Sequence, residues 1–146
     1  MTTAATPLVA VICEDDAVVA TALAHTLRDL YGMRVAATVR TGAAALVAAA
    51  SIQPNLVVID LALTGQRGLR IVPELHEAAP GCAVVVAAPP EFIDLRLDAV
   101  ASGAVTLVKT SDLRPLQCSV ERLIYVHGDN CPSCAARDRE SYWRQN

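Results

Sequence analysis

The sequence has few aromatic residues and no long apolar run. Only 3% of its 146 residues are aromatic, although 53% are hydrophobic. We therefore expect a core of Ala, Val and Leu side chains rather than of rings. No stretch approaches the roughly 20 consecutive apolar residues of a membrane-spanning helix, and the N-terminus lacks the basic segment that opens a signal peptide. These absences argue against a membrane protein and against a secreted one.

The chain also lacks a basic excess and the common phosphate-binding loops. Its net charge is −3, which argues against nucleic acid as a partner. It contains neither a Gly-Lys-Ser/Thr loop nor a Gly-x-Gly-x-x-Gly fingerprint. Five cysteines, an odd number in a chain long enough to form its own core, are typical of a reducing cytoplasm and not of a disulfide scaffold. We expect a cytoplasmic protein that does not bind DNA.

What the sequence does contain is a regular alternation of short apolar runs and longer segments with helical periodicity. The apolar runs have the length of buried strands, and the segments between them carry apolar residues at helical spacing. Such an alternation predicts an α/β protein with a doubly wound, five-stranded parallel sheet, the flavodoxin-like arrangement. Strands are expected at residues 8–13, 33–39, 55–59, 83–87 and 104–108, and helices at residues 19–30, 43–50, 69–79, 91–102 and 111–126.

Charged residues follow three of these expected strands. The first strand runs into an acidic triplet at residues 14–16, the third ends at Asp60 and the fifth ends at Lys109. Ligands bind at the carboxyl ends of the strands in open α/β sheets, so these side chains are expected to face one site. A carboxylate at the end of a buried strand is costly unless it is paired, metal-bound or used.

Several carboxylates and one lysine at a single site suit phosphoryl transfer. Neighbouring carboxylates raise one another's pKa, and a divalent cation relieves their repulsion. Oxygen ligands with several retained waters are what Mg²⁺ prefers. One carboxylate can then attack phosphorus while the metal and the lysine neutralise charge on the transferred group. The pattern predicts an aspartyl-phosphate site that uses Mg²⁺.

Three segments, "VICEDDAVV", "LVVIDLALTGQRGL" and "ASGAVTLVKTSDL", occur in an order and at a spacing that resemble the receiver domain of bacterial two-component response regulators. The resemblance covers about residues 7–126. It implies that Asp60 is the phosphoacceptor and that Glu14 and Asp15 are the acidic pair, with Asp15 favoured as the direct metal ligand. It further implies that the backbone carbonyl of Ala62 completes the Mg²⁺ site and that Lys109 contacts the phosphoryl group. The implied partner is a histidine kinase or a phosphotransfer protein.

Several positions depart from the pattern of that family. Ala87 stands where a Ser or Thr hydroxyl normally contacts the phosphoryl group, and Thr106 stands where an aromatic residue or His normally rotates inward. Thr110 follows Lys109 in place of the usual proline. In the segment after Asp60, Thr64 stands in place of a common proline and Arg67 in place of a common acidic residue. A conformational switch needs contacts that differ between its two states. We therefore expect an atypical receiver, which either accepts phosphate without the usual readout or binds partners regardless of phosphorylation.

The acidic residues also have structural interpretations. Asp15 or Asp16 could cap the helix that begins near Ala17, and we expect Asp16 to do so; Lys109 could be a solvated strand end. Haloacid-dehalogenase-type phosphatases also place a nucleophilic Asp after an apolar strand, but the second Asp that serves as their acid/base corresponds here to Ala62. We therefore expect a phosphoacceptor signalling domain and not an enzyme.

Protein contacts are the expected output. About 20 residues follow the last expected helix, too few for a DNA-binding domain, so we divide the chain into a stand-alone receiver at residues 1–126 and an extension at residues 127–146. The segment 91–102 carries two apolar stripes, which is more than one core face requires. In the family that the chain resembles, this helix contributes to the usual interaction face. We expect a homodimer or an unidentified downstream protein to bind there.

The C-terminal extension contains a Cys-x-x-Cys pair. Cys131 and Cys134 form a common half-site for tetrahedral zinc, and His127 could supply a third ligand. The same pair could instead form a redox-active disulfide, which would make the chain a metal- or redox-sensing adaptor. A solvated tail with two incidental thiols is the third interpretation, and the sequence leaves all three open.

Overall fold

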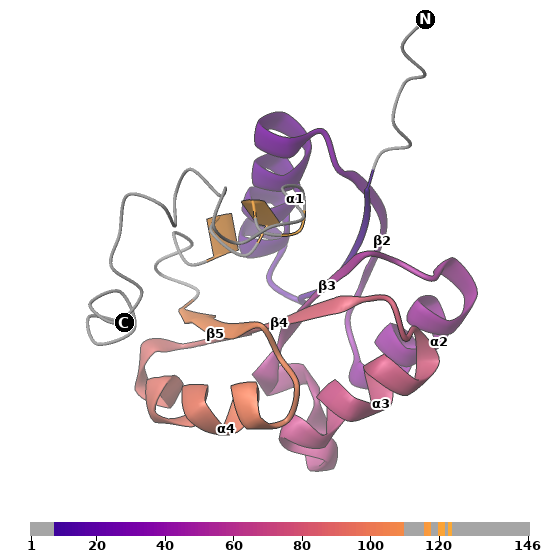
Figure 1. Cartoon of the computed structure of the whole chain (residues 1–146). Coiled ribbons are helices and arrows are strands. Elements are labelled where there is room, and N and C mark those ends of the chain that lie inside the picture. Colours follow the sequence, from indigo (N-terminus) through magenta and orange to yellow (C-terminus); the bar gives the residue numbers. More distant parts are fainter. Residues whose placement is uncertain (1–7, 110–115, 118–119, 122, 124–146) are drawn as a thin grey trace, which may run out of the picture.

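The computed structural model describes residues 8–109, 116–117, 120–121 and 123. Its centre is a five-stranded, fully parallel sheet with the strand order β2-β1-β3-β4-β5 (Figure 1). The reversal of strand order on either side of β1 is the doubly wound topology that the alternating pattern predicts. The predicted fold class is therefore confirmed. The strands are β1 (Val9–Cys13), β2 (Arg34–Val39), β3 (Leu56–Asp60), β4 (Ala83–Ala88) and β5 (Thr106–Lys109).

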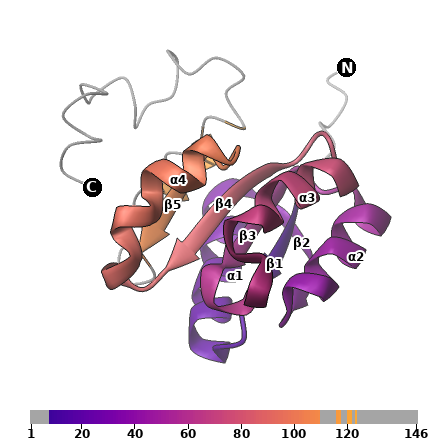
Figure 2. The ribbon, with the colours of Figure 1, turned by 90° about the horizontal axis from the view of Figure 1, so that it is seen from below.

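Helices cover both faces of the sheet. One face packs against α2, α3 and α4, which Figure 2 shows in front of the strands, and the other packs against α1 and the helical residues Leu116 and Val120. Alternate residues of each strand enter the two core clusters, as a sheet covered on both faces requires. None of the described helices is long and apolar enough to cross a membrane. The helices are α1 (Ala17–Tyr31), α2 (Gly42–Ile52), α3 (Ile71–Ala78) and α4 (Arg96–Ala101), and the 3₁₀ segments are η1 (Leu61–Leu63), η2 (Gly65–Arg70) and η3 (Pro90–Leu95).

The core confirms the expectation from composition. The largest fully buried side chains are aliphatic or Met, and the residues that fill both clusters are Ala, Val, Leu and Ile with Cys13 and Cys82 as small fillers. The one described phenylalanine, Phe92, is 42% exposed. Side chains without rings are smaller, so the packed elements can approach one another more closely. The many alanines of α2 allow that helix to lie close to the sheet.

Two predicted helices begin later than the apolar spacing suggested. The segment 91–102 is not one α-helix, because η3 precedes a short α4; Pro90 opens η3, and the N–H of Phe92 donates to the carbonyl of Pro89 at 3.0 Å. The segment 69–79 becomes α-helical only at Ile71. Just before it, Gly68 adopts φ 51° and ψ −135°, a non-helical conformation. Glycine adopts this conformation without the steric cost that other residues have. Of the expected helix at 111–126, the described residues are helical and the others lie outside the described part.

Candidate functional site

The acidic residues singled out in the sequence meet at the carboxyl edge of the sheet. Strands β1 and β3 are neighbours, with Cys13 paired to Ile59, so that Glu14 and Asp60 lie side by side at their ends. One carboxylate oxygen from each of Glu14, Asp15 and Asp60 lies within 4.8 Å of the others. We call these three residues the acidic site.

The backbone after β1 assigns a different task to each residue of the acidic triplet. The N–H of Glu14 donates to the carbonyl of Val39 at 3.0 Å, which continues the pairing with β2 and turns the side chain inward. Asp16 caps α1, because its Oδ1 accepts hydrogen bonds from the N–H groups of Val18 and Val19 at 2.8 and 3.2 Å. The prediction that Asp16 is the cap is confirmed. Asp15 is thereby left to the acidic site.

Glu14 is the buried member of the site. It is 4% exposed, its Oε1 accepts a hydrogen bond from the N–H of Asp16 at 3.0 Å, and its Oε2 is buried without a hydrogen-bond partner among the described residues. Burial raises the pKa of the Glu14 carboxyl to about 7; the hydrogen bond from Asp16 opposes the rise, and the negative charges of Asp60 and Asp15 add to it. An ionised Glu14 is therefore costly unless a cation lies beside it.

These observations fit a divalent cation. A buried carboxylate oxygen without a partner and three oxygens within 4.8 Å are the donor set that a hard cation such as Mg²⁺ takes. Asp60 is 8% exposed, and its Oδ1 accepts a hydrogen bond from the N–H of Ala62 at 2.8 Å. The same turn brings Ala62, whose carbonyl is the fourth predicted ligand, next to the acidic site.

A thiol lies beneath the carboxylates but does not compete with them as a nucleophile. Cys13 is 1% exposed, and its Sγ lies 3.4 Å from the carbonyl oxygen of Thr41. Burial, and then the negative charges of Asp60, Glu14 and Asp15, raise the pKa of the Cys13 thiol to about 12. The thiolate, which is the reactive form, is therefore scarce at neutral pH. This environment assigns Cys13 a packing role in the core.

The residues predicted to degrade the switch, Ala87 and Thr106, lie on β4 and β5. Ala87 pairs directly with Asp60 across β3 and β4, and it is 1% exposed, so a methyl group and no hydroxyl lies beside the carboxylate. Thr106 pairs with Val85 and is 2% exposed. Lys109 ends β5 beside Ala88 and is half-buried. Ala87 and Lys109 thus lie near the carboxyl ends of their strands, whereas Thr106 begins β5. Their roles toward a phosphoryl group stay predictions.

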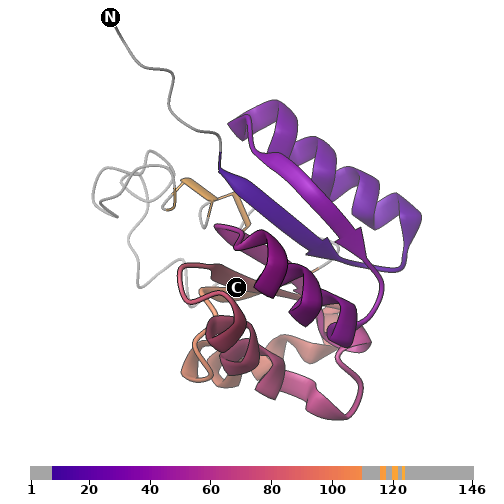
Figure 3. The same cartoon turned by 90° about the vertical axis from the view of Figure 1, so that its right-hand side faces the viewer.

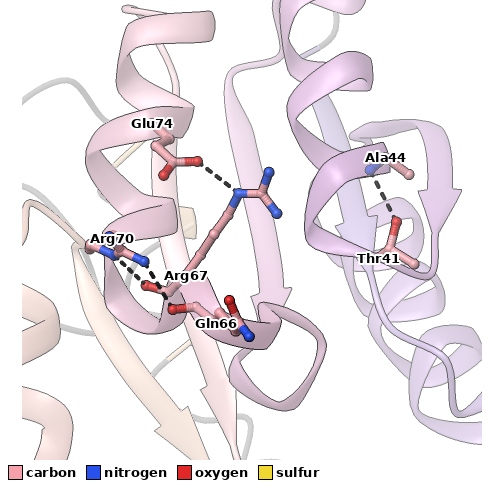
Figure 4. Close-up of polar contacts among 6 residues, drawn as sticks. All are labelled: Thr41, Ala44, Gln66, Arg67, Arg70 and Glu74. Carbon is pink, nitrogen blue, oxygen red and sulfur yellow. Dashed lines mark hydrogen bonds and ion pairs between the residues drawn. The ribbon is translucent and has the colours of Figure 1, made fainter.

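The loop after Asp60 is held by contacts that the sequence analysis missed. The buried Thr64 donates from its hydroxyl to the carbonyl of Leu61 at 2.7 Å, and Arg67 pairs with Glu74 at 3.0 Å (Figure 4). Arg70 donates to the carbonyls of Gln66 and Arg67 in the same loop. Arg67 and Glu74 are seven positions apart across the kink at Gly68, a spacing at which no regular helix would bring them together.

The predicted zinc or redox residues, His127, Cys131 and Cys134, lie outside the described residues. Their metal or redox role stays a prediction. The same holds for the boundary between a receiver at residues 1–126 and an extension at residues 127–146.

Comparisons with known proteins agree with the fold. A family model for the response regulator receiver domain matches residues 10–121. A two-component response regulator of the LuxR family from Aurantimonas sp. SI85-9A1 has a TM-score of 0.72 at 18% identity, over 94% of this chain and 99% of that one. The receiver domain of a DNA binding response regulator from Colwellia psychrerythraea 34H has a TM-score of 0.70 at 21% identity, over 81% and 98%. At these identities the solved structures show the fold alone.

One curated protein extends well beyond the matched region. Protein-glutamate methylesterase/protein-glutamine glutaminase 5 of Myxococcus xanthus (strain DK1622) is 30% identical over 128 residues, which are 87% of this chain and 36% of that protein. The chain therefore spans about a third of that relative's length. The activity in the relative's name is a property of that protein and is not carried over to this chain.

Proposed function

The chain belongs to the response regulator receiver family of two-component signalling, and from this premise we propose that Asp60 accepts a phosphoryl group with Mg²⁺ bound at the acidic site. The observation that carries the proposal is the convergence of Glu14, Asp15 and Asp60 within 4.8 Å beside a buried carboxylate oxygen that has no partner. Asp15, Asp60 and the carbonyl of Ala62 would hold the ion, with Glu14 next to it. Bound Mg²⁺ would supply positive charge to the oxygens of the transferred group.

The phosphoryl transfer is a displacement at phosphorus. A free carboxylate oxygen of Asp60 forms the new bond, the bond from phosphorus to the imidazole nitrogen of a phosphohistidine donor breaks, and its electron pair stays with that nitrogen. Oδ1 of Asp60 is held by the N–H of Ala62, which orients the carboxylate and leaves its other oxygen as the nucleophile. Lys109 is assigned to the oxygens of the phosphoryl group.

A phosphodonor protein has an exposed apolar surface available next to the acidic site. Val18 at the start of α1 is 79% exposed, and it lines a shallow hollow of about 530 Å³ with Ala22 and His25. A histidine kinase or phosphotransfer protein that covers this surface brings its histidine toward Asp60 and excludes water from the reaction.

The output is assigned to α4 and β5. Phe92, Leu97 and Val100 are large apolar side chains and are 42%, 76% and 43% exposed. An apolar surface of this kind suits a protein partner, either a second copy of the chain or a downstream protein. A histidine kinase or phosphotransfer protein as the phosphodonor stays a prediction from the sequence. The expectation that the chain does not bind DNA also stays a prediction.

A second candidate function uses the same fold without phosphorylation. It is favoured by the methyl group of Ala87 beside Asp60 and by the buried Thr106, since neither provides the contact through which receivers normally sense the phosphoryl group. In this case the chain is a binding or dimerisation module that acts through the α4–β5 surface.

Intact-mass spectrometry after incubation with a small phosphodonor and Mg²⁺ separates the two functions. We expect a single phosphoryl adduct on the wild type, none with EDTA and none on Asp60→Asn. Asp16→Asn is the matched control, because it removes a neighbouring charge and keeps a capping side chain. Absence of the adduct on the wild type, together with absence of Mg²⁺ binding, would contradict the phosphoacceptor function and leave the binding module.

A further inference from the structure

A groove runs between α1 and β2 on the outer side of the acidic site. We call it the α1–β2 groove. It has a volume of about 340 Å³ and is lined by small residues of α1 and by four longer or polar side chains. Besides residues near the acidic site, its lining comprises Ala20, Thr21, Ala24, Arg28, Thr38 and Arg40. Figure 3 shows α1, in indigo, lying along the first two strands. The volume is at the lower end of the range for small-molecule sites.

The shape of the groove follows from the sequence of α1. Ala17, Ala20 and Ala24 lie on one stripe of the helix at spacings of three and four residues, and each leaves space where a larger residue would contact β2. The stripe ends at Arg28 in the last turn, roughly 16 Å along the helix from Ala17. Side chains on a helix point back toward its N-terminus, so that Arg28 extends into the groove it lines.

The groove has two guanidinium groups that are not neutralised. Arg28 and Arg40 are both exposed, and among the described residues neither side chain forms an ion pair or a hydrogen bond. The two arginines of the loop after Asp60 differ from them, because Arg67 pairs with Glu74 and Arg70 donates to backbone carbonyls. Two free guanidinium forks on one small groove are suited to an anion that accepts several hydrogen bonds, of which phosphate is the best fit.

Two residues of the acidic site also belong to the groove. Glu14 and Asp15 both line the groove, and without a cation they would repel an anionic ligand. Mg²⁺ on these carboxylates would relieve that repulsion and offer coordination positions to phosphate oxygens. The groove therefore matches an anion that also binds Mg²⁺, and a diphosphate carries enough oxygens to contact the ion and a guanidinium group together.

We propose that the α1–β2 groove binds the Mg²⁺ complex of a small diphosphate-bearing ligand, a nucleoside diphosphate or a molecule of similar size, through Arg28 and Arg40. The site does not use Asp60 as a nucleophile and consumes no phosphoryl group. It rests on the proposed function in one respect, since it needs Mg²⁺ at the acidic site. A ligand in this position touches the metal site and α1 together, and so links the level of that ligand to phosphoryl acceptance.

Calorimetric titration of ADP into the full chain with Mg²⁺ tests the site. We expect binding that is lost when EDTA replaces Mg²⁺ and weakened about tenfold in each of Arg28→Gln and Arg40→Gln. Arg34→Gln is the matched control: it removes an exposed arginine from the other end of β2 that does not line the groove, and it leaves the affinity unchanged. Pyrophosphate is expected to compete with ADP, because the guanidinium groups recognise the phosphates.

The outcomes separate this site from the phosphoacceptor. ADP binding with the same affinity in both arginine variants, or binding with which pyrophosphate does not compete, would overturn the proposal. Absence of ADP binding by a protein that still binds Mg²⁺ and still forms the phosphoryl adduct on Asp60 would overturn it and leave the proposed function in place. Absence of Mg²⁺ binding and of the adduct would contradict the proposed function as well.

Discussion

The two halves of the sheet's carboxyl edge differ in what they retain. At the ends of β1 and β3, Glu14, Asp15 and Asp60 form a compact group of carboxylates within 4.8 Å. On β4, Ala87 places a methyl group opposite Asp60, and on β5 the buried hydroxyl of Thr106 lies at the start of the strand. The first half carries the acidic triad that is typical of a receiver Mg²⁺ site. The second half carries neither the hydroxyl nor the aromatic side chain that the family pattern leads us to expect at positions 87 and 106. Under the proposed function, acceptance and readout therefore depend on different strands.

The strongest test of the first half removes one of its carboxylates. We expect Asp15→Asn to weaken Mg²⁺ binding by at least about tenfold, because a charged ligand is lost. Asp16→Asn is expected to change the affinity by less than about twofold, since Asp16 caps α1 and does not belong to the acidic site. Calorimetric titration with Mg²⁺ measures both. Equal losses in the two variants would mean that the triplet acts only through its summed charge.

The buried Glu14 makes the first half sensitive to pH. Its folded pKa of about 7 lies above the ordinary glutamate pKa of 4.5, so the folded state binds the proton more tightly than the unfolded chain does. In metal-free buffer this stabilises the protein below pH 4.5, and the contribution is lost as the pH rises to about 7. We expect Glu14→Gln to gain stability relative to the wild type between pH 5 and pH 8, by on the order of 1 to 3 kcal/mol.

Urea unfolding of the wild type and of Glu14→Gln at pH 5 and pH 8, with EDTA, measures this difference in stability. Mg²⁺ is expected to stabilise the wild type at pH 8 more than the variant, because in the wild type it also compensates the charge of Glu14, which Glu14→Gln lacks. A stability difference between the two proteins that does not change between pH 5 and pH 8 would contradict a raised pKa of the buried Glu14 carboxyl.

We expect one hydroxyl on β4 to increase the rate of phosphorylation. Ala87→Ser places a hydrogen-bond donor on the residue paired with Asp60, and we expect phosphorylation by a small donor to accelerate about tenfold. Ala88→Ser is the matched control, because Ala88 is equally buried but lies in the core cluster on the other face of the sheet. Both variants bury a new hydroxyl, and only the first gains rate. Adduct formation followed by intact mass over time distinguishes them.

The smallest effect is expected in the loop that joins the two halves. Arg67 and Glu74 form an ion pair whose side chains are 42% and 39% exposed, so solvent screens most of their attraction. We expect Arg67→Ala to lower the free energy of unfolding by less than about 1 kcal/mol. A double-mutant cycle with Glu74→Ala measures the pair itself. A coupling well above this value would show that the loop, and not the carboxylates alone, positions Asp60.

Much of the fold was predictable because its signals are local. The five strands were located to within a few residues from apolar runs, and the cap at Asp16 from its place before an apolar helical segment. The helices at 69–79 and 91–102 were placed too early, because the kink at Gly68 and the 3₁₀ turn after Pro90 depend on how the chain packs around them. Periodicity alone carries no information about such interruptions.

The site divides in the same way. The sequence by itself determined which residues end the strands, and hence that Glu14, Asp15 and Asp60 would share one edge, because parallel strands all point their carboxyl ends the same way. Only the tertiary structure decided that Glu14 is buried with an oxygen lacking a partner, that Arg67 reaches Glu74 across a kink, and that Arg28 and Arg40 line one groove. Burial and contacts between distant segments arise from the packing of whole elements, which no single stretch of sequence specifies.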